Sequence, residues 1–178
     1  FEDWFADLIA NPTFFQALME KLADLWIEMA KDELDAVREN VDICFFGDDM
    51  AFQDGPMMSM DLYRKMIKPH HKRLFGYIKS RTSAKIAYHT CGSVAHLIPD
   101  LIEAGVDVID VSYGRLPRQI MPSKRLPMGT YVSQAEAIKK AADIPVIAVG
   151  RINSPELAAE IISQNRADLV ALARQLIT

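Results

Sequence analysis

The sequence predicts an α/β fold, and specifically a partial or fragmentary (β/α)8 TIM barrel with parallel strands and helical crossovers. Segments with helical spacing of apolar residues alternate with short β-rich apolar runs along the chain, which is typical of parallel sheets. Glycine and polar residues follow several of these runs, at the positions where barrel enzymes carry their sites. A complete barrel needs about 250 residues, so the 178 present leave room for about five or six of its eight units.

Composition excludes several classes of protein. Half of the residues are apolar and a quarter are charged, which is typical of a folded globular chain rather than a disordered one. No uncharged apolar run reaches the roughly 18 residues of a membrane span, and a net charge of −4 argues against nucleic-acid binding. Two cysteines cannot form a disulfide scaffold, so we expect a cytoplasmic protein.

The first part of the chain predicts three helices and two strands. An apolar stripe predicts a first helix with Asn11 as its N-cap and Pro12 in its first turn. The second begins at Ser59 and is kinked by Pro69, and the third ends at Gly105, which suits a left-handed C-cap. The predicted elements are a helix at 11–38, a strand at 41–46, a helix from 59 to 78, a strand at 85–88 and a helix at 94–104.

The second part continues the alternation. Ser133 and Glu136 have the spacing of a capping box at the start of a helix, and Ser154 with Pro155 predicts the start of another. The predicted elements are a strand at 106–112, a loop at 113–129, a helix from 133 to 142, a strand at 145–149, a helix from 154 and a strand at 168–172.

Several blocks in the first part match a known pattern in order. They are Val41–Asp42, Gly47–Ser59, Leu62–Tyr63, Lys68–Arg73, His89–Ser93 and Leu97–Asp107. These blocks resemble the uroporphyrinogen decarboxylase superfamily, and especially its cobalamin-dependent methyltransferase branch, over about residues 1–110. The resemblance implies a (β/α)8 barrel that acts on a small molecule.

The last part carries a different pattern. Its blocks are Ala135–Lys140, Ile144–Asn153 and Ala167–Arg174. They resemble the old yellow enzyme family of FMN-dependent NAD(P)H oxidoreductases, over about residues 106–178. Because both families are barrels, we expect one domain over 1–178, in which a uroporphyrinogen decarboxylase-like part (1–110) is joined to an FMN phosphate-binding part (111–178) as a chimera.

His89 and Cys91 are the first candidate site residues. They lie two apart on a predicted strand, so both side chains point to one face at its carboxyl end. Imidazole and thiolate are good zinc ligands. The methyltransferase resemblance implies zinc bound by this pair and a second, downstream cysteine, where it activates a thiol that takes a methyl group from a corrinoid protein. Residues 92–178 contain no cysteine, so a packed, hydrogen-bonded pair is the alternative.

Asp48 and Asp49 follow the first strand and are expected at the same edge of the sheet. Carboxylates there could bind a metal, orient a proton donor or hold a cationic substrate. Otherwise one caps the next segment and the other is solvated. A basic cluster of Lys68, His70, His71, Lys72 and Arg73 suits either a polycarboxylate ligand or a solvated helix face.

A phosphate site is predicted near the C-terminus. Gly150 allows close backbone approach, Arg151 brings positive charge, and Ser154-Pro155 opens a helix. The old yellow enzyme resemblance implies that Gly150 and Arg151, with Ala173 and Arg174, hold the FMN phosphate, although Ala173 replaces the usual glycine. Salt bridges of the two arginines are the alternative.

Three functions remain open from the sequence. The first is methyl transfer at zinc, with porphyrinogen decarboxylation as a variant; the second is FMN-dependent oxidoreduction. The third is an inactive chimeric or truncated barrel. Because an open parallel sheet exposes strand edges, we also expect a homo-oligomer.

Overall fold

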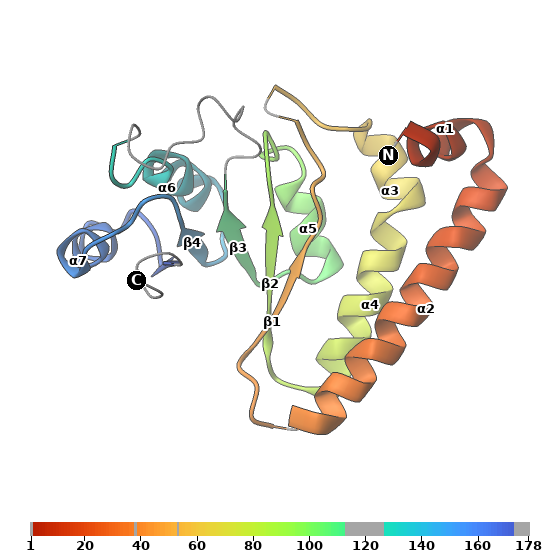
Figure 1. The fold of residues 1–178 in the computed structure, drawn as a ribbon, viewed down its shortest axis with the longest axis horizontal. Helices are drawn as coiled ribbons and strands as arrows, with labels where there is room; N and C mark the ends of the chain where they lie inside the picture. Colours follow the sequence, from red (N-terminus) through yellow and green to blue (C-terminus); the bar gives the residue numbers. More distant parts are fainter. Residues whose placement is uncertain (1, 38, 53, 113–126, 173–178) are drawn as a thin grey trace. The chain divides into compact units, whose positions relative to one another are not determined.

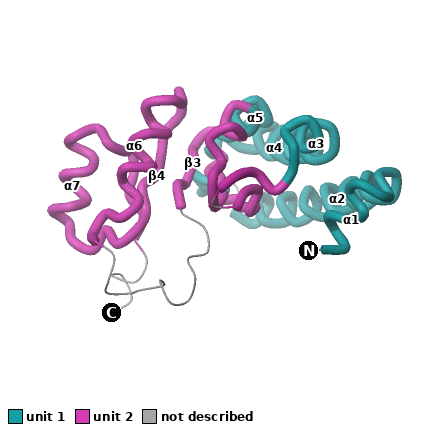
Figure 2. Tube along the Cα trace, turned by 90° about the horizontal axis from the view of Figure 1, so that it is seen from above, with its two compact units in different colours: residues 1–44, 58–85, 100–106 teal, residues 45–57, 86–99, 107–178 magenta. Residues whose placement is uncertain are grey.

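The structure of the chain is a computed structural model that describes residues 2–37, 39–52, 54–112 and 127–172 (Figure 1). The chain forms two compact units. Unit 1 comprises residues 1–44, 58–85 and 100–106, and unit 2 comprises residues 45–57, 86–99 and 107–178. Figure 2 colours them teal and magenta, and each is described separately.

Unit 1 is helical. It contains α1 (Glu2–Ala10), α2 (Pro12–Val37), α3 (Met60–Met66), α4 (Lys68–Arg81) and most of α5 (Ile98–Ala104). The long helix α2 packs along α4 (Figure 1). Phe15 of α2 and Phe75 and Ile78 of α4 are almost fully buried, so apolar burial holds these helices together. Helix α1 is not predicted from the sequence pattern, whereas Pro12 begins α2 as expected.

The predicted kink at Pro69 is a break between two helices. Helix α3 ends at Met66 with Ile67 as its C-cap, and Pro69 occupies the first turn of α4. A proline in the first turn costs no hydrogen bond, because its missing N–H would have no intrahelical acceptor there. The expected start of α3 is confirmed: the Ser59 side chain accepts a hydrogen bond from the Leu62 amide at 3.2 Å.

Most of unit 2 is a parallel α/β structure. It holds the sheet except residues 43, 44 and 85, which belong to unit 1. The strands are β1 (Ile43–Gly47), β2 (Lys85–Thr90), β3 (Val108–Val111), β4 (Val146–Ala148) and β5 (Leu169–Val170), in the order β1-β2-β3-β4-β5. The pairs β2–β3, β3–β4 and β4–β5 are parallel. Helices α6 (Val132–Ala141) and α7 (Pro155–Ser163) connect the later strands. This sequential parallel order confirms the predicted partial (β/α)8 barrel.

The middle strands are apolar and buried, as expected for a parallel sheet. Ile86 and Ala87 of β2, Ile109 of β3, and Val146 and Ala148 of β4 are each at most 1% exposed. The register pairs His89 with Asp110 and Val111 with Ala148. Asp110 of β3 therefore lies beside His89 of β2, which is a candidate site residue.

Two predicted helix starts are wrong. Helix α6 begins at Val132. The Ser133 hydroxyl donates a hydrogen bond to Oε1 of Gln134 instead of capping the helix. Helix α5 begins at Ile98 and not near 94. Its end is as predicted: Gly105 has a positive φ of 117°, and Val106 donates back to the Leu101 carbonyl. Of the predicted loop at 113–129, only residues 127–129 lie within the described part of the chain.

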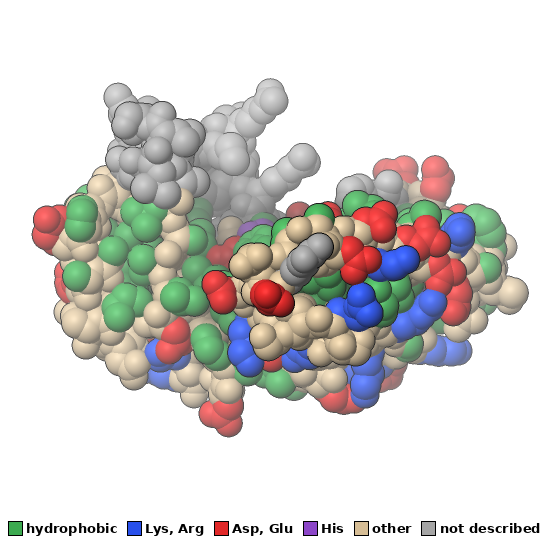
Figure 3. All heavy atoms as spheres, turned by 90° about the horizontal axis from the view of Figure 1, so that it is seen from below, with side chains coloured by type: hydrophobic (Ala, Val, Ile, Leu, Met, Phe, Trp, Pro, Cys, Tyr) green, Lys and Arg blue, Asp and Glu red, His purple; other side chains and the backbone are tan. Residues whose placement is uncertain are grey.

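The surface carries mixed charge. On the face shown in Figure 3, acidic and basic side chains are interspersed, with hydrophobic side chains between them. Among the described residues, no helix combines the length and the hydropathy that a membrane span needs.

Candidate functional site

The candidate site lies at the carboxyl ends of β1 and β2, within unit 2. Gly47 ends β1 beside His89, and a Cβ on Gly47 would lie 3.3 Å from the Cβ of His89. The Asp48 amide donates to the His89 carbonyl at 3.1 Å. These contacts bring the segment after β1 against the end of β2, as the sequence predicts for Asp48 and Asp49.

His89 lies between a carboxylate and a thiol. Its Nδ1 is 2.7 Å from Oδ2 of Asp110, and its Nε2 is 3.3 Å from Sγ of Cys91. The pKa of His89 is raised, mainly because Asp110 accepts a hydrogen bond from the ring and to a smaller extent because Asp110 and Asp49 carry negative charge; partial burial opposes the shift. The side chains of His89 and Cys91 therefore meet, as their spacing predicts.

Asp49 joins this pair. Donor atoms of Asp49, His89 and Cys91 all lie within 4.8 Å of one another. Asp49 is exposed, whereas His89 and Cys91 are partly buried. An oxygen, a nitrogen and a sulfur donor at this separation form the kind of set that binds a zinc-class ion.

Asp48 has a different environment from Asp49. Its Oδ2 lies 3.5 Å from the Tyr88 hydroxyl, and it does not belong to the three-residue donor set. Cys44 of β1 is also outside that set, and burial is the main cause that raises the pKa of its thiol. Of the two consecutive aspartates, only Asp49 has a place beside His89 and Cys91.

A short hairpin covers the backbone at the end of β2. Ala51 and Pro56 form an antiparallel bridge, and the Phe52 amide donates to the Gly55 carbonyl. The hairpin is tied to the strand end because the Ser93 amide donates to the Phe52 carbonyl at 2.8 Å. This hydrogen bond holds the backbone that follows Cys91.

The predicted phosphate turn follows β4, at the same carboxyl edge of the parallel sheet as the end of β2. Gly150 and Arg151 both have positive φ, of 108° and 53°. The ring of Tyr131 packs against Gly150, where a Cβ would lie 2.4 Å from the Tyr131 Cδ2 atom. Ala173 and Arg174 lie outside the described residues.

The start of α7 is largely satisfied within the chain. Ser154 caps the helix as predicted, accepting from the Leu157 amide with its hydroxyl and from the Ala158 amide with its carbonyl. Pro155 has no N–H to offer. In the described part of the predicted phosphate site, Arg151 therefore lies in the turn after β4, and the first turn of α7 has few amide donors left.

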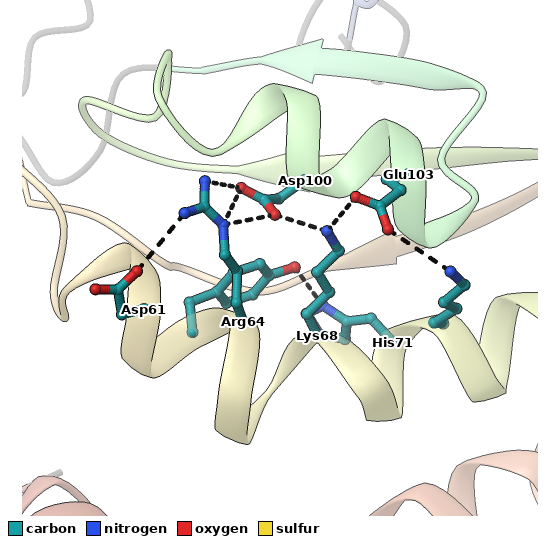
Figure 4. Close-up of polar contacts among 8 residues, drawn as sticks. Asp61, Arg64, Lys68, His71, Asp100 and Glu103 are labelled. Atoms are coloured by element: carbon teal, nitrogen blue, oxygen red, sulfur yellow. Dashed lines mark hydrogen bonds and ion pairs between the residues drawn. The ribbon is translucent and has the colours of Figure 1, made fainter.

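The basic cluster of α4 is engaged inside unit 1 (Figure 4). Lys68 Nζ lies 2.7 Å from Asp100 Oδ1 and 2.6 Å from Glu103 Oε2 of α5, and Arg64 of α3 also binds Asp100. The Tyr63 hydroxyl contacts Nδ1 of the buried His71 at 3.1 Å. These contacts make the cluster part of the packing between helices.

The family assignment comes from the first 130 residues, which match the profile of the uroporphyrinogen decarboxylase (URO-D) family. The chain belongs to the uroporphyrinogen decarboxylase family. Among solved structures, a methyltransferase from Methanosarcina mazei superposes on this URO-D family chain with a TM-score of 0.62 at 16% identity, covering 96% of this chain and 46% of that one. At this identity the similarity is one of fold.

Curated proteins that match part of this URO-D family chain are named as oxidoreductases, not as decarboxylases or methyltransferases. An NADH oxidase of Thermoanaerobacter brockii is 50% identical over 80 residues, which are 43% of this chain and 12% of that protein. An NADPH dehydrogenase of Clostridium acetobutylicum is 42% identical over 86 residues, 48% of this chain and 23% of that one. These matches confirm the resemblance to the old yellow enzyme family. The chain thus spans less than a quarter of the length of these two relatives.

A second solved structure shares the fold of this chain. Histamine dehydrogenase from Rhizobium sp. 4-9 superposes with a TM-score of 0.63 at 15% identity, covering 88% of this chain and 26% of that one. At 15% identity this similarity is again one of fold.

Sequence reasoning missed one residue of the site, Asp110. Its signal is a carboxylate inside the otherwise apolar strand Val108–Val111, where all four residues are buried. Its meaning depends on the register of two strands, because Asp110 is 21 residues from His89 in the sequence and beside it in the sheet.

Proposed function

We propose that this chain carries a zinc-class ion on Asp49, His89 and Cys91 and transfers a methyl group from a methylated corrinoid to the sulfur of a small thiol. The observation that supports it most is the set of three different donor atoms within 4.8 Å at the carboxyl end of β2. Catalytic zinc sites have three protein ligands and leave one position for water or substrate. The donor set fits that pattern, with Asp49 in place of a second cysteine.

The bound ion would act as a Lewis acid that lowers the pKa of a coordinated thiol and so favours its thiolate form. The chain's own residues hold and orient this site. His89 lies near the end of β2 and Cys91 directly follows that strand, and the hydrogen bond from Ser93 to the hairpin holds the backbone after Cys91. Asp49 arrives from the segment whose amide at Asp48 is bound to the His89 carbonyl.

The transfer step balances without another redox reagent. The thiolate sulfur of the substrate forms a bond to the methyl carbon, and the carbon–cobalt bond of the methylated corrinoid breaks. The electron pair of that bond stays on cobalt, so the products are a methyl thioether and a reduced corrinoid. We infer a corrinoid protein as the partner that presents the methyl group.

The basic cluster favours methyl transfer over porphyrinogen decarboxylation. A porphyrinogen has many carboxylates, which call for cationic side chains that can reach them. Lys68 is held by Asp100 and Glu103, and Arg73 pairs with Glu20 and Asp24 of α2. These cations are therefore occupied by carboxylates of the chain itself.

An assay with methylcobalamin and a small thiol tests the proposal. The purified chain is loaded with zinc, and the methyl thioether is measured by mass spectrometry while the corrinoid spectrum is followed. We expect zinc-dependent thioether formation that is lost in Cys91→Ser and His89→Ala and retained in the exposed control Asp143→Asn. Absence of thioether from a folded, zinc-loaded chain would contradict the proposal.

Flavin binding is the second candidate, and it is favoured by the identity of 42–50% to an NADH oxidase and an NADPH dehydrogenase. For this candidate we infer that the chain binds the phosphate of FMN at Arg151, and we infer no redox reaction. The described residues do not form an open cradle, because Tyr131 covers Gly150 and Ser154 takes two amides of α7. Titration of FMN by fluorescence, with Arg151→Ala as the variant, tests this candidate; unaltered binding in the variant would contradict it.

A further inference from the structure

Asp110 is a buried carboxylate with one engaged oxygen. Its Oδ2 lies 2.7 Å from Nδ1 of His89, whereas its Oδ1 is buried and has no hydrogen-bond partner among the described residues. The residue as a whole is 8% exposed. A buried carboxylate oxygen without a partner is unfavourable for folding, so the stability of the fold does not explain this residue.

The contact determines how the His89 ring carries its proton. An ionised carboxylate can only accept a hydrogen bond, so Nδ1 must be the protonated nitrogen that faces Asp110. In the neutral ring this leaves the lone pair on Nε2, the atom that lies 3.3 Å from Sγ of Cys91. The lone pair therefore belongs to the nitrogen that lies beside the Cys91 thiol.

We propose that Asp110 is a positioning residue that holds His89 in the tautomer and ring orientation in which Nε2 can bind a metal. The inference rests on the proposed metal site, and it adds a residue from a third strand. Histidine ligands usually donate their second ring N–H to such a partner, and loss of the partner typically weakens metal affinity about 10- to 100-fold.

A second aspartate on the same segment provides the comparison. Asp107 comes just before β3, and its Oδ2 accepts a hydrogen bond from the Ile86 amide at 2.9 Å. Ile86 is fully buried, so removal of the Asp107 carboxylate would leave the buried N–H of Ile86 without this hydrogen-bond acceptor. Asp107 thus has a structural role three residues from Asp110 and away from the metal donors.

The experiment compares Asp110→Asn with Asp107→Ala, measuring zinc affinity by competition with a chromophoric chelator and stability by thermal unfolding of the metal-free chain. We expect Asp110→Asn to bind zinc about 10- to 100-fold more weakly with an unchanged or higher unfolding temperature. Asp107→Ala should unfold at a lower temperature and bind zinc like the wild type. Wild-type zinc affinity in Asp110→Asn, or a loss of stability as large as that of Asp107→Ala, would overturn the proposal.

Nuclear magnetic resonance of the wild-type chain gives a second test that needs no variant of Asp110. In ¹⁵N-labelled, zinc-loaded protein, the His89 ring should carry its proton on Nδ1. Protonation of Nε2 would overturn the inference. The first test measures zinc affinity and stability, and the second measures the site of protonation of His89. Neither depends on turnover, so weak zinc binding in Asp110→Asn would support the role of Asp110 even if no methyl transfer were found.

Discussion

Gly92 faces the backbone of the hairpin that follows β1. A Cβ on Gly92 would lie 2.5 Å from the Phe52 carbonyl oxygen and 2.6 Å from that of Ala51. The φ of Gly92 is 89°, which L-residues rarely adopt. Only glycine therefore allows the hairpin to approach the residue that follows Cys91.

We predict that Gly92→Ala destabilises the chain by about 3 kcal/mol, because the positive φ and the backbone clash both oppose a Cβ. Urea denaturation measures this loss as a difference in the free energy of unfolding between the variant and the wild type. Gly76 of α4 is the control: a Cβ there meets nothing within 4 Å, so Gly76→Ala should stabilise the helix by roughly 0.5–1 kcal/mol. Equal stabilities of the two variants would contradict the described packing.

The space beside Gly150 is limited by a side chain, whereas that beside Gly92 is limited by backbone atoms. Because a Cβ would lie 2.4 Å from Cδ2 of Tyr131, Gly150→Ala should lose about 2–4 kcal/mol of stability through steric overlap and its φ of 108°. In a Tyr131→Ala background, the loss of stability caused by steric overlap should disappear. The loss caused by the positive φ should remain. A double-mutant cycle measures the difference, and additive effects would show that the ring does not restrict this position.

The ion pairs of unit 1 predict a dependence of stability on pH. Hydrogen bonds from Arg64 hold the pKa of Asp100 below its usual value, against the effect of burial, and Lys68 contributes in the same direction. A lowered pKa in the folded state stabilises the chain above the unfolded pKa of about 3.9. This contribution is lost as the pH falls through the folded-state pKa.

Asp100→Asn should therefore be less stable near neutral pH, by about 1.5–3 kcal/mol, because Arg64 and Lys68 lose the charged carboxylate that both contact, while Lys68 keeps Glu103. Its stability should also change less than that of the wild type between pH 5 and pH 3, values that bracket the usual aspartate pKa of about 3.9. Asp61→Asn is the matched control, because Asp61 also faces Arg64 but its side chain is 98% exposed. Parallel pH curves for wild type and Asp100→Asn would exclude this network as the cause.

The sequence was sufficient to predict the strands and the contact between His89 and Cys91. Apolar runs define strands, and alternation along a strand places residues two apart on the same face. The helix starts were harder to predict. Ser133 and Glu136 have the spacing of a capping box, but Glu136 instead pairs with Arg166 and Lys140, and Val132 is buried as the first residue of α6.

Asp110 could not be assigned from the sequence for a different reason. Its role depends on the pairing of β2 with β3, which places it opposite His89, and one residue of register shift would point it to the other face of the sheet. The position of Asp49 within reach of Cys91 likewise depends on the hairpin after β1.

Metal binding by the purified chain tests the central claim most directly. The chain is titrated with Co²⁺, whose absorption reports thiolate coordination, and zinc content is measured by elemental analysis after dialysis. We predict one ion per chain, with a sulfur-to-cobalt charge-transfer band that disappears in Cys91→Ser and binding that weakens in Asp49→Asn. A folded wild-type chain that binds neither ion, or that binds them equally well without Cys91 and Asp49, would contradict the account.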